Sequence, residues 1–251
     1  MSKLIAVTGK GGVGKTTVSA LLIKNLIASG KKPILAIDAD PNSCLDAALG
    51  VKVANTVGRA REEVRSVVTG GTNASLSKHE MLQLKIEEAL VDAENFDLIA
   101  MGRPEGAGCY CYANDVLKSV IKELSAQYPY VVLDNEAGLE NLSRRIVQKV
   151  DLMTLISDAS NAGLQTLLRL YELANEMEMH YDKLALVVNR VRNGKLPDRM
   201  EEIQKTTRAD IVIGLSNDDT IARFAEESRP FLDIPEDNPV YQKVQELAAA
   251  L

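Results

Sequence analysis

GKGGVGKTT, residues 9–17, matches the pattern G-x-x-x-x-G-K-[ST] and directly follows the short apolar run KLIAVT, residues 3–8. Glycines in such a turn let backbone N–H groups curl around phosphate oxygens without a steric clash at Cβ. The pattern also opens a helix, whose N-terminal end favours the same anion. A strand, a glycine-rich turn and a helix in this order predict a phosphate-binding loop, or P-loop.

Two residues carry most of the chemistry expected of this loop. We expect Lys15 to lie against the β- and γ-phosphates of a nucleotide and Thr16 to offer its hydroxyl to Mg²⁺. The loop residues predicted to bind the nucleotide are Gly9, Gly11, Gly12, Val13, Gly14, Lys15, Thr16 and Thr17. Lys10 is a second lysine in the loop, and its position alone is also typical of a lysine that only faces solvent.

The rest of the chain alternates short apolar runs with longer helical patterns. The runs that predict buried strands are residues 3–8, 33–38, 96–101, 130–134, 152–157, 184–189 and 210–214. The segments that predict further helices are residues 79–90, 113–126, 139–149, 160–178 and 217–228. This alternation predicts an α/β fold in which a mainly parallel sheet carries helices on both faces, as in P-loop NTPases. Because no linker or repeat divides the sequence, we expect a single domain over residues 1–251.

Composition narrows the class of protein. The 251 residues are 46% hydrophobic and 25% charged, which is ordinary for a globular protein. We expect no membrane span, because no apolar run reaches about 18 residues, and the N-terminus does not resemble a signal peptide. The net charge of −6 argues against a nucleic-acid partner. Three cysteines do not make a disulfide framework, so a reducing cytoplasm is the expected location.

Acidic residues follow two of the predicted strands, where ligands of parallel sheets bind. IDADPN, residues 37–42, places Asp38 and Asp40 after the second strand. Two carboxylates there suit a Mg²⁺-bound water and an attacking water, whereas a simple Asp–Pro turn is the alternative. Asp134 ends the fourth predicted strand and is expected to bind Mg²⁺ directly or through water. The predicted magnesium set is therefore Thr16, Asp38 and Asp134.

Two further positions are candidates for nucleotide contact. Gly138 would let its backbone N–H approach a γ-phosphate, so that this loop responds to ATP versus ADP. Asn189 ends the strand 184–189, and an amide that donates and accepts suits the N6/N7 edge of adenine. Asparagine after a strand is also a common turn residue. Asn135 and Glu136 receive no role.

GAGCYCYAN, residues 106–114, places Cys109 and Cys111 one residue apart. Buried free cysteines often act as small hydrophobic residues, but this stretch is rich in glycine and polar residues. A disulfide within C-x-C would be strained and easily reduced, which is the redox interpretation. Residues i and i+2 of an extended chain point the same way, so both sulfurs can also reach one metal ion. Two thiolates are half of a tetrahedral site.

The loop KGGVGKTT resembles the deviant Walker A loop of the MinD/ParA/nitrogenase-iron-protein class of P-loop ATPases. The resemblance implies a homodimer in which Lys10 reaches across to the nucleotide of the partner. It further implies that Asp40 activates the attacking water while Asp38 lies near the metal, and that residues 134–138 form a switch that ends in Gly138. Asparagine at position 189 would contact the base. The catalytic residues implied are Lys10, Lys15 and Asp40.

Three features together resemble the narrower CooC family of nickel-insertion ATPases, which mature carbon monoxide dehydrogenase, with relatives that serve acetyl-CoA synthase. They are the deviant loop, DPNSCL (residues 40–45) and the CYC stretch (residues 109–111). The family implies that Cys109 and Cys111 of both subunits bind Ni²⁺ or Zn²⁺ at the two-fold axis, with ATP hydrolysis tied to delivery to a client enzyme. Cys44 is expected to be structural.

Two other functions use the same scaffold. Four thiolates at a dimer axis could hold a [4Fe–4S] cluster, as in the nitrogenase iron protein, although its ligands are widely separated in sequence. A positioning ATPase of the cell-division or plasmid-partition type is the third interpretation. Cell-division members end in a basic amphipathic helix, whereas NPVYQKVQELAAAL, residues 238–251, has one lysine and predicts a helix that packs on the domain. The sequence does not distinguish nickel from zinc or identify the client.

Overall fold

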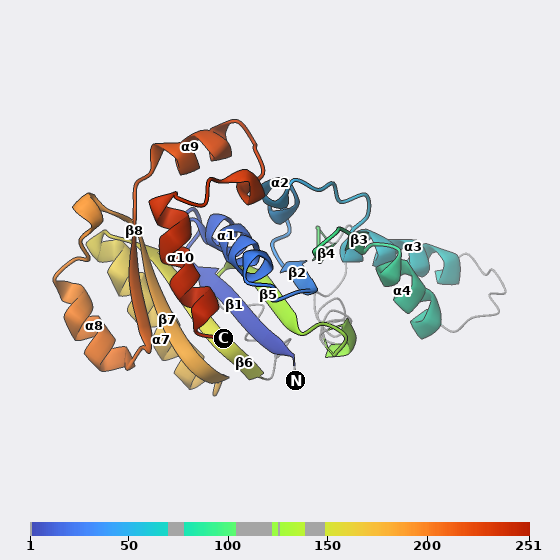
Figure 1. Cartoon of the computed structure of the whole chain (residues 1–251). Helices are drawn as coiled ribbons and strands as arrows, with labels where there is room; N and C mark the ends of the chain where they lie inside the picture. Colours follow the sequence, from blue (N-terminus) through green and yellow to red (C-terminus); the bar gives the residue numbers. More distant parts are fainter. Residues whose placement is uncertain (1, 70–77, 104–121, 125, 139–148) are drawn as a thin grey trace.

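The computed structural model describes residues 2–69, 78–103, 122–124, 126–138 and 149–251, which form an eight-stranded sheet at the centre of the molecule (Figure 1). The strands are β1 (Lys3–Gly9), β2 (Ile34–Asp38), β3 (Val91–Asp92), β4 (Phe96–Ala100), β5 (Tyr130–Ala137), β6 (Lys149–Asp158), β7 (His180–Val191) and β8 (Ile211–Ser216). Their order is β3-β4-β2-β5-β1-β6-β7-β8, and every pair is parallel except β3–β4. All seven predicted strands are confirmed. The two-residue β3 is too short to show a sequence pattern.

Helices cover this sheet. They are α1 (Lys15–Ala28), α2 (Leu45–Leu49), α3 (Val57–Thr69), α4 (Lys78–Glu87), α7 (Asn161–Glu176), α8 (Arg199–Thr207), α9 (Asp219–Glu226) and α10 (Pro239–Ala249). The predictions for 79–90, 160–178 and 217–228 are confirmed by α4, α7 and α9. Most of the predicted helix 113–126 lies outside the described residues. So does the predicted helix 139–149 except Lys149, which was wrongly assigned because it opens β6.

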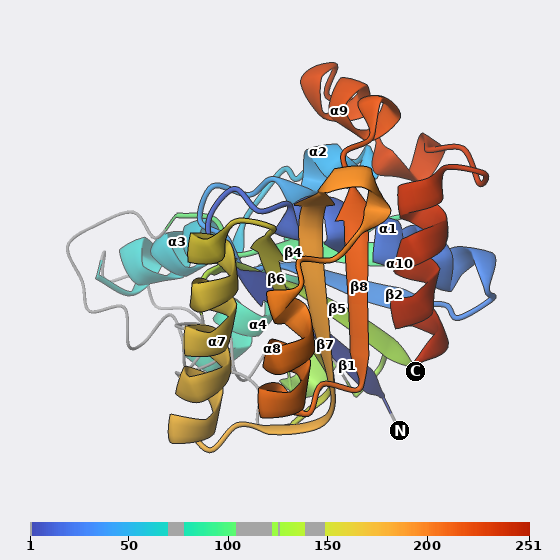
Figure 2. The ribbon, with the colours of Figure 1, turned by 90° about the vertical axis from the view of Figure 1, so that its left-hand side faces the viewer.

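The side chains of the sheet make two apolar layers, one on each face. Leu35 and Leu186 belong to the layer that packs with α3, α4, α7 and α8. Ile5 and Val132 belong to the layer that packs with α1, α2, α9 and α10. Figure 2 shows α7 and α8 on the side of the sheet opposite α1 and α10. The mainly parallel sheet with helices on both faces is therefore confirmed, because near-continuous apolar strands need cover on both sides.

The C-terminal helix is part of this core. Val240, Val244 and Leu247 of α10 are buried, and the Asn25 side chain of α1 donates to the carbonyl of Tyr241 at 3.2 Å. The prediction that this segment packs on the domain is thus confirmed. None of the helices in the described part of the chain combines the length and apolar character that a membrane span requires.

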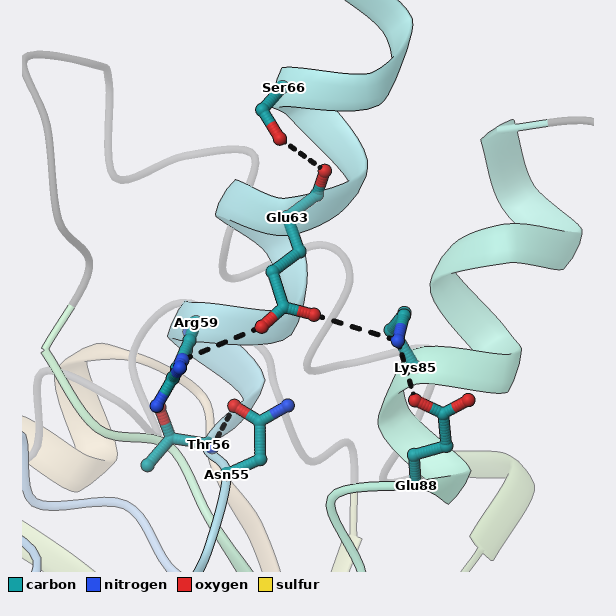
Figure 3. Close-up of polar contacts among 7 residues, drawn as sticks. All are labelled: Asn55, Thr56, Arg59, Glu63, Ser66, Lys85 and Glu88. Atoms are coloured by element: carbon teal, nitrogen blue, oxygen red, sulfur yellow. Dashed lines mark hydrogen bonds and ion pairs between the residues drawn. The ribbon is translucent and has the colours of Figure 1, made fainter. Parts of the chain in front are cut away.

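Helices α3 and α4 pack against each other beside β3 and β4 (Figure 1). Figure 3 shows Glu63 of α3 between Arg59 of the same helix, at 3.5 Å, and Lys85 of α4, at 3.6 Å. Lys85 also pairs with Glu88 at 2.6 Å. Thr56 caps α3 by accepting the backbone N–H of Arg59 at 3.3 Å. Exposed ion pairs contribute at most about 1 kcal/mol each, so buried apolar residues hold these helices to the sheet.

Candidate functional site

A cavity of about 480 Å³ opens where β1, β2 and β5 end. The strand register explains why its residues meet. Asp38 of β2 lies beside Asp134 of β5, and Gly9 of β1 lies beside Ala137 of β5. The lining residues are Gly11, Gly12, Gly14, Lys15, Thr16, Thr17, Asp40, Asn42, Glu136, Ala137 and Arg190. The structure therefore brings the predicted phosphate-binding loop and the predicted water-activating Asp40 to one cavity.

The P-loop turns tightly between β1 and α1. Gly12 and Gly14 have φ values of 76° and 96°, a region that residues with a Cβ rarely adopt. The Lys15 side chain folds back over the loop, and its Nζ donates to the carbonyl of Lys10 at 3.3 Å. Lys10 itself is exposed and is not among the residues that line the cavity. Two lysines of one loop thus occupy different environments.

Gly9 is confined by the neighbouring strand rather than by its backbone angles. A Cβ at Gly9 would lie 2.3 Å from the carbonyl oxygen of Ile156 in β6, whereas one at Gly11 would meet nothing closer than 3.9 Å. We therefore expect Gly9→Ala to lower the free energy of unfolding by about 1–3 kcal/mol and to weaken ATP binding. Gly11→Ala is the matched control for stability, expected within about 0.5 kcal/mol of wild type. Urea unfolding checks both, and equal midpoints for the two variants would contradict the expectation.

Asn189 supports the P-loop from β7. Its Nδ2 donates to the carbonyl of Val13 at 2.8 Å, and its Oδ1 accepts the Arg190 N–H at 2.8 Å. The amide also lies against Gly14, where an added Cβ would approach Nδ2 to 2.5 Å. Asn189 therefore holds the loop in this structure, and its predicted contact with adenine stays a prediction.

Asp134 is a buried carboxylate at the end of β5. It is 1% exposed and accepts a hydrogen bond from Ser19 Oγ at 3.0 Å. Burial, together with the nearby charge of Asp38, raises the pKa of Asp134 to about 7, although hydrogen bonds from Thr16 and Ser19 and the charge of Lys15 act in the opposite direction. The hydrogen bonds and the positive charge around Asp134 therefore do not fully replace the hydration that its carboxylate loses on burial.

Asp38 is the second buried carboxylate. Its oxygens accept the backbone N–H groups of Asp40, at 3.0 Å, and of Leu45, at 2.9 Å. Burial raises the pKa of Asp38 to about 6 despite these hydrogen bonds. Asp38 therefore shapes the loop after β2, a role that its strand-end position did not predict.

Thr16, Asp38 and Asp134 suit Mg²⁺, which the fold implies. Mg²⁺ prefers oxygen ligands, and two neighbouring buried carboxylates with raised pKa values gain from a nearby cation. These residues would hold the ion directly or through water, and the ion would offset the negative charge of nucleotide phosphates.

Asp40 lines the cavity and has defined partners. Its Oδ1 accepts both the backbone N–H of Asn42, at 2.8 Å, and the Asn42 Nδ2, at 3.0 Å. Gly138, with a φ of 92°, donates its N–H to the carbonyl of Gly9 at 3.1 Å, and its own carbonyl accepts the Thr8 hydroxyl. The predicted approach of the Gly138 N–H to a γ-phosphate would exchange one of these bonds and stays a prediction.

Several residues of the site were not predicted. Asn42, Glu136, Ala137 and Arg190 line the cavity, and Ser19 binds Asp134. Asn42 had a signal in the sequence, because Asp-x-Asn favours an Asx turn of the kind seen here. Asn135 donates from Nδ2 to the carbonyl of Val7 at 3.1 Å, which links β5 to β1.

Cys109 and Cys111, the predicted metal ligands, lie outside the described residues. Cys44 is exposed as a residue, but its thiol is partly buried. This burial, followed by the charges of Asp38 and Asp40, raises the pKa of the thiol. A raised thiol pKa disfavours the thiolate that metals bind. Within the described ranges, no cluster of three or more His, Cys, Asp or Glu side chains is arranged to hold a metal ion.

Comparison with known proteins agrees with this geometry. Residues 4–231 match the family described as CobQ/CobB/MinD/ParA nucleotide binding domain. An uncharacterised ATP-binding protein of Methanocaldococcus jannaschii is 43% identical over 246 residues, which cover 98% of this chain and 96% of the relative. The carbon monoxide dehydrogenase accessory protein CooC of Rhodospirillum rubrum is 32% identical over 189 residues, or 69% of each chain.

MinD proteins are similar at greater distance. The septum site-determining protein MinD of Bacillus subtilis is 29% identical over 238 residues, which cover 92% of this chain and 82% of that protein. The structure of MinD from Pyrococcus horikoshii with Mg-ADP superposes with a TM-score of 0.68 at 22% identity, covering 99% of this chain and 95% of that one. At this identity the structural match shows the fold alone.

Proposed function

Because this chain belongs to the CobQ/CobB/MinD/ParA family of P-loop nucleotide-binding domains, we propose that it hydrolyses ATP as a homodimeric nickel chaperone. In this proposal it inserts nickel into a client enzyme such as a carbon monoxide dehydrogenase or an acetyl-CoA synthase. The observation that carries the ATPase part is that Lys15, Thr16 and Asp40 line the same cavity. The similarity to CooC and the Cys109/Cys111 pair support the nickel part.

ATP hydrolysis needs one water, one proton acceptor and positive charge close to the phosphates. Asp40 accepts the proton of the water whose oxygen forms a bond to the γ-phosphorus, while the bond from that phosphorus to the β–γ bridging oxygen breaks. ADP and phosphate are the products. Lys15 turns from the carbonyl of Lys10 toward the β- and γ-phosphates, a short movement of a side chain that already lies over the loop.

The homodimer would complete the site. Lys10 is exposed, and its side chain forms no hydrogen bond or ion pair with another residue in the described part of the chain. Its charge acts on Asp158, whose pKa is lowered first by the Ser160 hydrogen bond and also by Lys10. A lysine placed outside its own phosphate cavity is available to the nucleotide of a second copy.

Nickel would be the cargo of this dimer. Cys109 and Cys111 from two subunits supply four thiolates, a set that binds Ni²⁺ or Zn²⁺. Hydrolysis changes the contacts between subunits, alters the spacing of the two thiol pairs and releases the ion. The similarity to MinD keeps a positioning ATPase as the alternative. An iron–sulfur protein would be distinguished by an oxygen-sensitive brown colour on purification.

An anaerobic Ni²⁺ titration of the reduced, metal-free full-length chain tests the cargo. We expect saturation at one nickel per two chains with thiolate-to-metal charge-transfer absorbance, and loss of both in Cys109→Ala/Cys111→Ala. Cys44→Ala is the matched control and should bind as wild type does, because its thiol is not expected to ionise readily. Nickel binding that survives in the double variant would refute the proposed Cys109/Cys111 site, and the absence of nickel binding in the wild type would favour the positioning ATPase.

A further inference from the structure

Arg103, Asn42 and Asp40 form a chain of hydrogen bonds that ends at the phosphate cavity. The Arg103 guanidinium donates from Nη2 to Oδ1 of Asn42 at 2.6 Å. Asn42 donates twice to Oδ1 of Asp40, from its backbone N–H at 2.8 Å and from Nδ2 at 3.0 Å. Asp40 and Asn42 line the cavity, whereas Arg103 does not. Among the described contacts, Arg103 therefore reaches the cavity through Asn42.

The contact with Arg103 fixes which way the Asn42 amide faces. An amide carries oxygen on one side and NH₂ on the other, so a half-turn exchanges an acceptor for donors. A guanidinium has donors only, and it is satisfied only when the amide oxygen faces it. Oδ1 of Asn42 is thereby held toward Arg103, and Nδ2 is left toward Asp40. Without Arg103 the amide is free to turn, and the carboxylate of Asp40 then loses one of the two hydrogen bonds that Asn42 donates to it.

The backbone of Arg103 is itself held by the first turn of α3. The Gly58 N–H donates to the carbonyl of Met101 at 2.9 Å. An added Cβ at Gly58 would lie 2.8 Å from the carbonyl oxygen of Arg103, and one at Gly102 would lie 2.4 Å from Thr56 Oγ1. Thr56 is the cap of α3 that Figure 3 shows next to the α3–α4 ion pairs. The first turn of α3 and its cap thus pack directly against the backbone of residues 101–103, which carries the side chain that contacts Asn42.

We propose that Arg103 is a positioning residue for ATP hydrolysis, which acts through Asn42 to orient the Asp40 carboxylate. The inference rests on the proposed function, because it takes Asp40 as the acceptor of the water proton. It adds to the determinants of the rate a residue from the segment after β4, a strand that β2 and β5 separate from β1 and the P-loop. Asn42 and Arg103 are exposed, so their contact contributes little to folding stability.

Steady-state ATP hydrolysis by the full-length protein tests the proposal. We expect Arg103→Ala to lower kcat about three- to tenfold, the value of one hydrogen bond made to the reacting group, with an unchanged KM for ATP and an unchanged Tm. Arg103→Lys should recover most of the rate, because an ammonium group also donates to the amide oxygen. Arg199→Ala is the matched control, since Arg199 makes a similar exposed bond at 3.0 Å, but its partner Gln165 does not line the cavity as Asn42 does.

A double-variant cycle shows whether Arg103 acts through Asn42. If it does, Asn42→Ala/Arg103→Ala has the same kcat as Asn42→Ala alone. A double variant whose loss equals the product of the two single losses would overturn the proposal, and so would a wild-type kcat in Arg103→Ala. Asp40→Asn distinguishes a failure of the proposed function from a failure of the inference about Arg103. A wild-type rate in that variant would refute the proposed role of Asp40, and the inference with it. A large loss in Asp40→Asn combined with a multiplicative cycle would refute the inference alone.

Discussion

Asp134→Asn is expected to abolish Mg²⁺-dependent ATP hydrolysis and, at the same time, to stabilise the nucleotide-free protein above pH 7. The carboxylate is buried with a pKa of about 7, so the neutral amide removes a charge that the fold compensates poorly. It keeps an oxygen for the Ser19 hydroxyl, which donates to Asp134 at 3.0 Å. Because Asp134 is a proposed magnesium ligand, its replacement should lower kcat at least about 100-fold, since the ion would supply several kcal/mol of charge stabilisation.

The stability effect has a defined dependence on pH. An unfolded aspartate has a pKa of about 3.9, so between that value and about 7 the folded protein binds the extra proton. Wild-type stability therefore falls as pH rises through this window, and the penalty is complete above pH 7. The Asn variant does not titrate there, so its advantage in Tm should be near zero at pH 4 and largest at pH 8. Each kcal/mol corresponds to about 2–4 °C in a domain of this size.

Thermal unfolding from pH 4 to pH 8 measures this difference. Asp158→Asn serves as a control of opposite sign, because the pKa of Asp158 is lowered by the Ser160 hydrogen bond and by Lys10. Its contribution to stability is present above the pKa of an unfolded aspartate and is lost as pH falls, so Asp158→Asn should be less stable than wild type at pH 8. An Asp134→Asn protein that is less stable than wild type at pH 8 would show that hydrogen bonding outweighs desolvation at this position.

Features that depend on neighbouring residues in sequence were predicted well. The P-loop, the strands and the strand-end position of Asp134 follow from local patterns and from the rule that ligands bind at the carboxyl ends of parallel strands. Strand order was not predicted, because apolar runs of similar composition do not show that β5 lies between β1 and β2. That order places Asp38 beside Asp134, and the charge of Asp38 adds to burial in raising the pKa of Asp134.

Features that depend on the backbone path were missed. The bond between Arg103 and Asn42 joins residues 61 positions apart, and it exists because β4 ends beside β2. Asp38 was predicted as a magnesium residue from its place after a strand, but whether its oxygens also accept N–H groups depends on how the next seven residues turn. The bond from the Gly138 N–H to the carbonyl of Gly9 was not predicted either, whereas the expected approach of this N–H to a phosphate stays a prediction. Such bonds are set by tertiary contacts that one sequence does not reveal.

Mixing two inactive variants is expected to restore ATP hydrolysis if Lys10 acts on the nucleotide of the partner. Lys10→Ala and Asp40→Asn should each lower kcat by about 100-fold or more, the usual range for a trans-acting cation or a catalytic acid–base group. In a mixed dimer, the subunit that carries Lys10→Ala keeps its own Asp40 and receives Lys10 from its partner. That site is intact, whereas the other site lacks both residues.

The expected size of the recovery follows from random pairing. Equal amounts of the two variants form mixed dimers in about half of the pairs, and one of two sites in each is intact, so about a quarter of the wild-type rate should return. A mixture of Lys15→Ala with Asp40→Asn is the matched control. Lys15 and Asp40 line the same cavity of one chain, so every site of that mixed dimer lacks one of them and no activity should return.

Recovery in the first mixture alone would place Lys10 at the nucleotide of the second subunit, in agreement with its exposure and its absence from the lining of its own cavity. If neither mixture recovers although the variants exchange subunits, Lys10 serves its own chain, and the dimer no longer explains why the loop carries two lysines. Analytical ultracentrifugation with ATP distinguishes that outcome from a failure to dimerise, because Lys10→Ala should also weaken the nucleotide-dependent dimer. The assignment of Lys10 therefore depends on rate and assembly measured on the same variants.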